Sequence, residues 1–230
     1  MHPARALLAL CRGDTAATAA MLTRGGVRSW VICCVTIVIG CALFGGAIGW
    51  WRAPLQGFYT AAKMPLLIFA TCLANGLLNG LLAQVLGAGL SFRQSLLAIL
   101  MSFTIAALVL AALSPIVYLL VANAPPLASE GSRVGHSVVL LSAVSFIAYA
   151  GVAAVRRLLG LLIAICNSRE VATRLFWSWL AGNLFLGAQL SWVLRPFIGS
   201  PGLPVQFLRD DPLRGNFYEA VGGALLHLLS

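Results

Sequence analysis

The sequence predicts an all-α integral membrane protein, a helical bundle of about five transmembrane helices with amphipathic segments at both termini. Two observations predict this fold class. Of the 230 residues, 60% are apolar and only 9% are charged, whereas about a quarter of the residues in a soluble domain are charged. The apolar residues also fall into long runs, near the ~20 residues that a helix needs to cross the hydrocarbon core. We therefore expect most of the exterior to face lipid.

The apolar runs between charged residues predict five spans and three regions of the chain. The runs are too long and too uniformly apolar for barrel strands, which alternate and are about ten residues long. Residues 1–29 are predicted to be a cytoplasmic segment that can form an amphipathic helix, and 30–194 the transmembrane domain. Residues 195–230 are predicted to be an external cap, rich in proline and aromatic residues, that ends in an interfacial helix. The expected spans are 30–51, 64–90, 94–121, 137–155 and 175–194.

Basic residues predict the orientation. With a cytoplasmic N-terminus, nine Arg or Lys residues lie in the inner segments and six in the outer segments. Cytoplasmic loops are enriched in Arg and Lys, so we expect a multi-pass protein of the cell inner (cytoplasmic) membrane with an external C-terminus. The nine are Arg5, Arg12, Arg24, Arg28, Arg93, Arg156, Arg157, Arg169 and Arg174. The six are Arg52, Lys63, Arg133, Arg195, Arg209 and Arg214.

Several classes of chemistry are disfavoured. The net charge of +9 comes from residues at the ends of apolar runs, not from a basic stripe with interleaved aromatics, so we expect no nucleic-acid partner. None of the six acidic residues lies in a predicted span, which disfavours a proton- or sodium-driven carrier. No catalytic or phosphate-binding motif and no metal-ligand spacing is present, so we expect no cofactor or metal. We expect the single lysine, Lys63, to extend its ammonium to the membrane interface.

Amides in two predicted spans form a candidate polar cluster within the membrane. Asn75 and Asn79 lie four residues apart beside glycines, and Asn183 and Gln189 lie in the fifth span. Amides in hydrocarbon need hydrogen-bonding partners. One interpretation is close helix packing with interhelical hydrogen bonds, and the alternative is a polar substrate site. In the third span, Pro115 predicts a kink, which can accommodate packing or form a gate.

The segment after the fifth span forms the second candidate site. Four prolines with aromatic residues between them predict an ordered cap on the membrane surface. Its candidate residues are Arg195, Arg209, Asp210 and Asp211, and we expect Arg195 to pair with Asp210, Asp211 or Glu219. The cap is either structural or a platform for lipid headgroups or a partner.

A short stretch resembles a known family. The sequence from Asn79 to Gly87, followed by Leu90-Ser91-Phe92-Arg93-Gln94-Ser95-Leu96, is similar to the bacterial Yip1-like membrane proteins, in which a helix ends in glycines before a Ser-Phe-Arg-Gln turn. The resemblance covers about 60 residues, and the cap is not part of it. It implies a polytopic helical protein linked to membrane organisation or trafficking.

Three functional hypotheses follow from the sequence. The first is a non-enzymatic membrane-organising or complex-assembly component, whose partners are the lipid bilayer and either its own copies or other membrane subunits. It depends on the absence of charge within the spans and on the abundance of glycine. The second is a small transporter or channel subunit with a neutral polar path along the amides. The third is a lipid-handling membrane enzyme that uses the cap.

Overall fold

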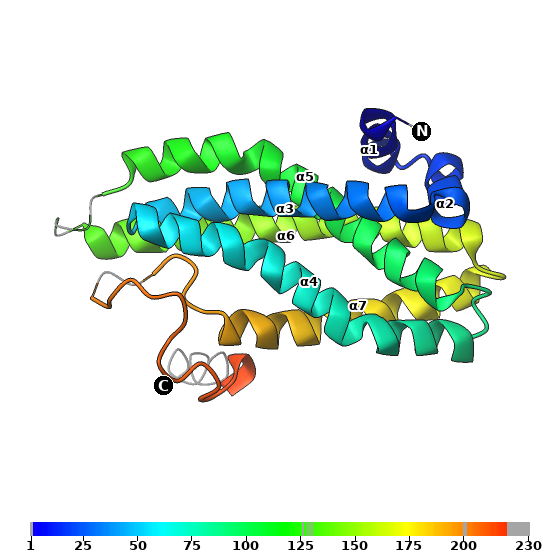
Figure 1. Cartoon of the computed structure of the whole chain (residues 1–230). Coiled ribbons are helices and arrows are strands. Elements are labelled where there is room, and N and C mark those ends of the chain that lie inside the picture. Colours follow the sequence, from blue (N-terminus) through cyan, green and yellow to red (C-terminus); the bar gives the residue numbers. More distant parts are fainter. Residues whose placement is uncertain (1, 126, 128, 130, 200–201, 220–230) are drawn as a thin grey trace.

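The computed structural model describes residues 2–125, 127, 129, 131–199 and 202–219. Seven α-helices and no strand occur in these ranges (Figure 1). The predicted interfacial helix over 217–229 lies mostly outside the described residues, and only its start, 217–219, is described as helical. The helices are α1 (Pro3–Arg12), α2 (Thr15–Arg24), α3 (Gly26–Trp50), α4 (Pro54–Val85), α5 (Phe92–Asn123), α6 (Ser132–Ile165) and α7 (Arg169–Val193).

Four helices, α3, α4, α5 and α6, are long and apolar enough to cross a membrane, judged by length and composition. The fifth long helix, α7, has 25 residues but is more polar and does not meet the same criterion. The described chain is therefore an all-helical bundle with four candidate membrane-spanning helices.

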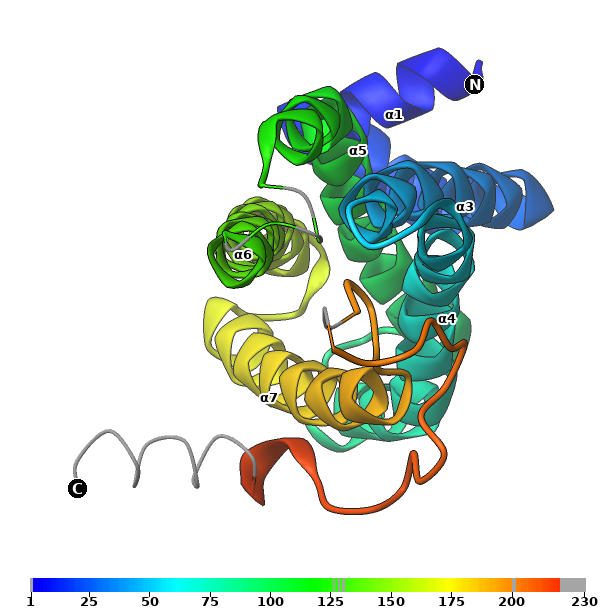
Figure 2. The ribbon, with the colours of Figure 1, turned by 90° about the vertical axis from the view of Figure 1, so that its left-hand side faces the viewer.

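The five long helices form a closed arrangement when viewed along the bundle (Figure 2). Helix α3 packs against α4 and α5, α6 lies between α5 and α7, and α7 returns to α4. The connections alternate between two ends (Figure 1). The N-terminal end of the bundle carries α1, α2 and the turns at 86–91 and 166–168. The cap end carries the turns after α3 and α5 and the segment 195–219, which we call the cap.

The helices extend beyond several boundaries that charges predicted. Helix α4 begins at Pro54, not at 64, because proline is well suited to a first helical turn, and the helix continues through Gly57 to Lys63 and beyond. Helix α6 continues through Arg156 and Arg157 to Ile165, so the residues after 155 extend the fourth predicted helix. A charge can mark the edge of the hydrocarbon without ending the helix.

Glycine ends two elements earlier than expected. The predicted N-terminal helix is divided at Gly13, whose φ of 71° is left-handed, and the Asp14 side chain then caps α2 by accepting the Ala17 N–H at 3.0 Å. Helix α4 ends at Val85 and not at 90, because Gly87 and Gly89 have φ values of 65° and 72°.

Helix α5 contains Pro115 and is bent (Figure 1). Proline has no backbone N–H, and its ring crowds the preceding turn, so a bend is expected at this position. The Ser114 hydroxyl donates to the Leu110 carbonyl oxygen at 2.9 Å on the same stretch of helix. The structure thus places a locally hydrogen-bonded bend in α5.

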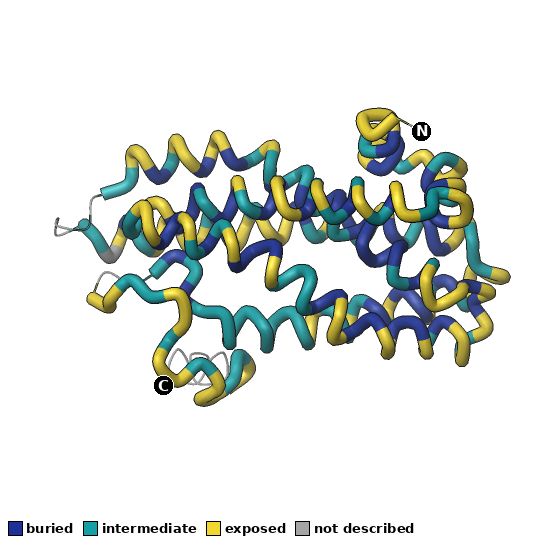
Figure 3. The backbone as a smooth tube through the Cα atoms, viewed as in Figure 1, coloured by how far each residue is buried: buried dark blue, intermediate teal, exposed yellow. Residues whose placement is uncertain are grey.

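Burial follows the facing sides of the helices (Figure 3). The core includes Phe44, Leu97, Leu175 and Trp179, whereas large apolar side chains such as Leu73 are exposed on the outside. An apolar exterior of this kind is unfavourable in water and suits a lipid environment.

Candidate functional site

The predicted amides meet at the interface between α4 and α7. The Asn75 Nδ2 group donates to Asn183 Oδ1 at 3.1 Å. A Cβ atom on Gly182 would lie 3.0 Å from Asn75 Nδ2, so a larger residue at 182 would crowd this amide. The buried Trp179 of α7 donates its indole N–H to the Asn79 carbonyl oxygen at 2.9 Å. Two polar contacts, about one turn apart, therefore join α4 to α7.

The four predicted cluster residues do not all take part. Asn79 is only 1% exposed, and neither of its side-chain polar atoms has a hydrogen-bond partner in the described chain. Asn75 Oδ1 is also unpaired. Gln189 is half-buried, and no hydrogen bond of its side chain is found among the described residues. The structure brings Asn75, Asn79 and Asn183 to one interface and leaves Gln189 about two turns away on α7.

A second polar site lies on the first turns of α4, where Gln56, Thr60 and Lys63 share one helix face and are fully buried. These side chains bind backbone carbonyls of the cap. Gln56 Nε2 donates to the Pro196 and Phe197 oxygens at 3.0 and 3.1 Å. The Thr60 hydroxyl also donates to the Phe197 oxygen. We call these three residues the cap seat.

Lys63 belongs to the cap seat and does not extend to the interface, so this expectation was wrong. Its ammonium donates to the Pro196 oxygen at 2.9 Å and lies 4.8 Å from the centre of the Phe207 ring. The Phe197 ring lies at 5.9 Å. A carbonyl dipole and two aromatic faces thus replace part of the water that a buried cation loses. The only ion pair within the described ranges is Glu170–Arg174, elsewhere in the chain.

The cap seat was not among the sites predicted from the sequence. Its signal is the spacing of Gln56, Thr60 and Lys63 at i, i+4 and i+7, which places three polar side chains on one face of an otherwise apolar helix. A helix start predicted at residue 64 excluded this pattern from the helix.

Arg195 binds carbonyls and not the acidic residues expected for it. Its guanidinium donates to the Trp192 oxygen at 2.8 Å and lies 3.8 Å from the centre of the Trp192 ring. Weaker contacts at 3.4 Å reach the Pro212 and Arg214 oxygens. Within the described part of the chain, neither Asp210, Asp211 nor Glu219 forms an ion pair with it.

The other predicted cap residues lie nearer the surface. Asp210 is exposed and accepts a hydrogen bond from Gln206 at 3.3 Å. Asp211 is exposed, and Arg209 is half-buried. Carboxylates that keep their water gain little from a surface ion pair, whereas the partly buried Arg195 needs protein acceptors. The cap thus orders itself mainly through backbone carbonyls.

Further contacts fix the cap across the end of the helix ring (Figure 2). The Arg52 guanidinium donates to the Leu203 oxygen at 2.9 Å. Tyr218 donates its hydroxyl to the Phe185 oxygen at 3.3 Å, and the two rings are stacked. These side chains hold one part of the chain against another. No cluster of three or more metal-ligating side chains occurs in the residues described.

The chain matches no known family model, and no characterised protein or solved structure is significantly similar to it. The resemblance to Yip1-like proteins therefore stays a prediction. The fold and the two sites define an all-helical protein with four apolar helices of membrane-spanning length, in which buried polar groups join helices to each other and to a cap.

Proposed function

We propose that this protein is a five-span, non-enzymatic component of the cell inner membrane that works by assembling with a second copy of itself. The proposal includes α7 as the fifth span, a cytoplasmic N-terminal end and an external cap. The single observation that carries the assembly is an exposed seam along α6. The hydrogen bonds that the buried polar groups form within the protein support a structural role.

Helix α7 has the dimensions of a span. Its 25 residues correspond to about 37 Å, compared with a hydrocarbon core of about 30 Å. Its Asn183 is hydrogen-bonded on the α4 side, while Trp177 and Leu184 are exposed. Polar groups turned inward and apolar groups turned outward are what lipid requires.

The buried polar groups serve packing. Twelve polar or charged residues are buried in the described chain, and ten of them donate a side-chain hydrogen bond to another protein group. The two others are Asn79 and Ser102. Groups that are already paired cannot also bind and release a substrate without losing those bonds. Of the four candidate amides, Asn75 and Asn183 bond to each other, whereas Asn79 and Gln189 make no side-chain hydrogen bond in the described chain. The Asn75–Asn183 pair therefore favours packing over a polar path.

The α6 seam consists of six exposed residues spaced 4-3-4-3-4 along the helix, the spacing of a coiled-coil interface. Their outward position is shown by Val134 and Leu141, which are 62% and 67% exposed. Two small residues, Ser145 and Ala148, lie at the centre of the seam and allow close approach of another helix. The seam comprises Val134, Val138, Leu141, Ser145, Ala148 and Val152.

Two features on or next to the seam, unpaired hydroxyls and a helical glycine, are not explained by contacts within a single copy. The hydroxyls of Ser145 and Tyr149 make no hydrogen bond in the described chain, although Tyr149 is 64% exposed near the middle of α6. Unpaired hydroxyls are costly in hydrocarbon. A Cβ atom on Gly151 would meet nothing within 4 Å, yet glycine within a helix costs about 1 kcal/mol relative to alanine. A neighbouring helix explains both features.

A second copy fits this seam. Two copies with the same topology are related by a two-fold axis along the membrane normal, so their α6 helices run parallel and like residues meet. The seam is uncharged and therefore self-complementary. Its heptad spacing favours the left-handed crossing, near +20°, that is common in membrane bundles.

Copurification tests the proposal. Two differently tagged copies of the full chain are expressed together, extracted in mild detergent and purified through one tag. We expect the second tag to copurify, and Ala148→Trp to reduce its recovery at least tenfold, because the larger ring separates the seams. Removing the hydroxyls with Tyr149→Phe is expected to weaken dimerisation about threefold, since an interhelical hydrogen bond in membranes contributes about 0.6 kcal/mol.

Ala164→Trp is the matched control, because Ala164 is an exposed alanine of α6 that lies off the seam. It is expected to leave recovery unchanged. The proposal is wrong if the wild-type chain is monomeric both in detergent and after cross-linking in native membranes. Equal recoveries for the two tryptophan variants would also exclude α6 as the interface.

A further inference from the structure

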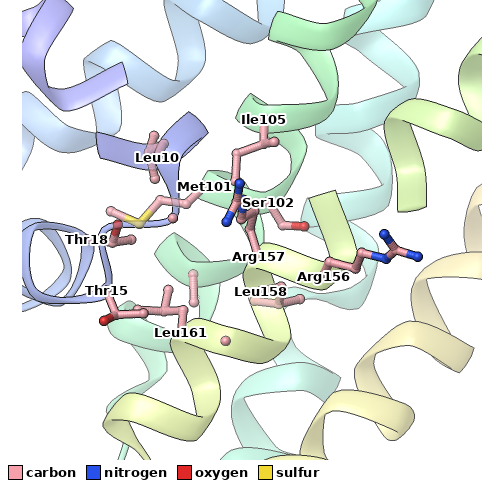
Figure 4. A pocket seen from close by; sticks show the side chains of 13 residues that line it. Leu10, Thr15, Thr18, Met101, Ser102, Ile105, Arg156, Arg157, Leu158 and Leu161 are labelled. Atoms are coloured by element: carbon pink, nitrogen blue, oxygen red, sulfur yellow. The ribbon is translucent and has the colours of Figure 1, made fainter. Parts of the chain in front are cut away.

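A small cavity lies where the hinge between α1 and α2 faces α5 and α6 (Figure 4). Its volume is about 80 Å³. Since one water needs at least 10–15 Å³ of such volume, the cavity has room for roughly five waters or for one compact ion. It opens at the N-terminal end of the bundle, away from the amide cluster and the cap seat.

The cavity is lined by a cation without a counter-ion. Arg157 forms no ion pair or hydrogen bond with the described residues, and its guanidinium lies directly against Gly13, where a Cβ atom would be 2.2 Å from Arg157 Nη1. Asp14, beside the hinge, uses its carboxylate to cap α2. Burial raises the pKa of the Cys11 thiol, with Arg157 acting in the opposite direction, so the thiol stays neutral at neutral pH.

Ser102 of α5 adds an unpartnered donor to the cavity wall. It is 8% exposed, lines the cavity, and has no hydrogen-bond partner in the described ranges. By contrast, Thr104 and Ser114 on the same helix donate to carbonyls four residues earlier. Thr15 at the start of α2 also lines the cavity, but its side chain is exposed to solvent. Because Ser102 lines the cavity and its hydroxyl has no protein acceptor in the described chain, this hydroxyl is free to donate to a bound ligand.

The surrounding charge favours an anion. The N-terminal end of the bundle carries the nine arginines counted as inner residues but only two described acids, Asp14 and Glu170. Glu170 is paired with Arg174 at 2.6 Å. Guanidinium forks and hydroxyls together are well suited to the oxygens of a phosphate. The Arg157 cation, the Ser102 donor and the small volume of the cavity thus indicate a compact oxyanion as the ligand.

We propose that this cavity binds a phosphate-type oxyanion, held by the Arg157 guanidinium and by the Ser102 hydroxyl. The bound anion fastens the α1–α2 hinge to α5 and α6. Its source is either the headgroup phosphate of an anionic phospholipid or free phosphate. The site does not depend on dimerisation through α6.

Thermal unfolding of the full chain in neutral detergent tests the site, with tryptophan fluorescence as the signal. Inorganic phosphate is titrated at constant ionic strength in one arm. Phosphatidylglycerol is titrated in the other, with diacylglycerol as the lipid that lacks phosphate. We expect a saturable rise in Tm with at least one phosphate compound and none with diacylglycerol. A rise with phosphatidylglycerol alone identifies the headgroup, and a rise with inorganic phosphate identifies free phosphate.

The variants link the response to the cavity. Arg157→Gln is expected to weaken binding at least about tenfold, because a charge-assisted hydrogen bond contributes about 1.5–3 kcal/mol. Arg156 also lines the cavity, but its guanidinium points away from it (Figure 4). Arg156→Gln therefore removes the same charge one residue away and should bind like the wild type. If Arg157→Gln does not fold, Ser102→Ala is expected to weaken binding severalfold. The absence of any saturable shift, or equal affinity in the wild type and the cavity variants, overturns the proposal.

Discussion

At the scale of single residues, the cap seat pairs buried donors of α4 with carbonyl oxygens of the cap, and only the Gln56 Oε1 atom is left without a partner among the described residues of the seat. Lys63 is fully buried, and its ammonium is met by the Pro196 oxygen and by two phenylalanine rings. Gln56 and Thr60 bind neighbouring carbonyls of the same segment. Each donor on α4 thereby satisfies an acceptor on the cap, and both elements are held in place.

Two buried threonines of α4 allow a matched test of this arrangement. Thr60→Val removes a hydroxyl that reaches across to the Phe197 oxygen. Thr71→Val removes one that bonds only within α4, to the Leu67 oxygen at 2.8 Å. We expect Thr60→Val to weaken cap docking by about 1 kcal/mol, the usual contribution of one hydrogen bond. Limited proteolysis of the cap, resolved by mass spectrometry, should show faster cleavage for Thr60→Val and an unchanged rate for Thr71→Val; equal rates would contradict this role.

At the scale of helices, the interface between α4 and α7 depends on complementary positions in the two elements. Asn75 and Asn183 form the hydrogen bond, Gly182 leaves room for it, and Trp179 binds the Asn79 carbonyl one turn away. The interface joins the most polar of the five long helices to the bundle, so its loss should affect α7 first.

A double-mutant cycle measures that hydrogen bond. Asn75→Leu or Asn183→Leu alone leaves the partner amide unpaired and should destabilise the chain by about 1–3 kcal/mol. The double variant should cost less than the sum of the two, because both polar partners are removed together. Unfolding in detergent gives the free energies. Additive costs would indicate that the two amides act independently, as they would in a polar path.

The sequence predicted the helices better than the contacts between them. Apolar runs located all five long helices, because the hydrocarbon limits a span to a narrow choice of length and composition. The amides of 75 and 183 were placed in one polar cluster, with helix packing as one of its two interpretations, because an amide in lipid needs a hydrogen-bonding partner. Lys63 and Arg195 were misplaced because rules for charges near membranes assume water or a carboxylate. For Lys63 the acceptor is a carbonyl 133 residues away, which no local pattern shows. For Arg195 the acceptors are carbonyls 3, 17 and 19 residues away, in the same turn and in the cap.

At the scale of the whole molecule, the proposed topology depends on which end of the bundle faces which compartment. The N-terminal end has the exposed arginines and the proposed oxyanion cavity, and the cap closes the opposite end (Figures 1 and 2). The N-terminus and the cap lie in different compartments only if the chain crosses the membrane an odd number of times. Whether that number is odd depends on whether α7 is a span. With α7 across the bilayer, the turn at 166–168 is cytoplasmic and the cap is external.

The most direct test of this account is a pair of reporter fusions, one after residue 168 and one after residue 219, on either side of α7. Each fusion carries an alkaline phosphatase, which is active outside, or a fluorescent protein, which is active inside. The account predicts fluorescence for the fusion after 168 and phosphatase activity for the fusion after 219. The same compartment for both fusions would show that α7 does not cross the membrane and would contradict the five-span bundle.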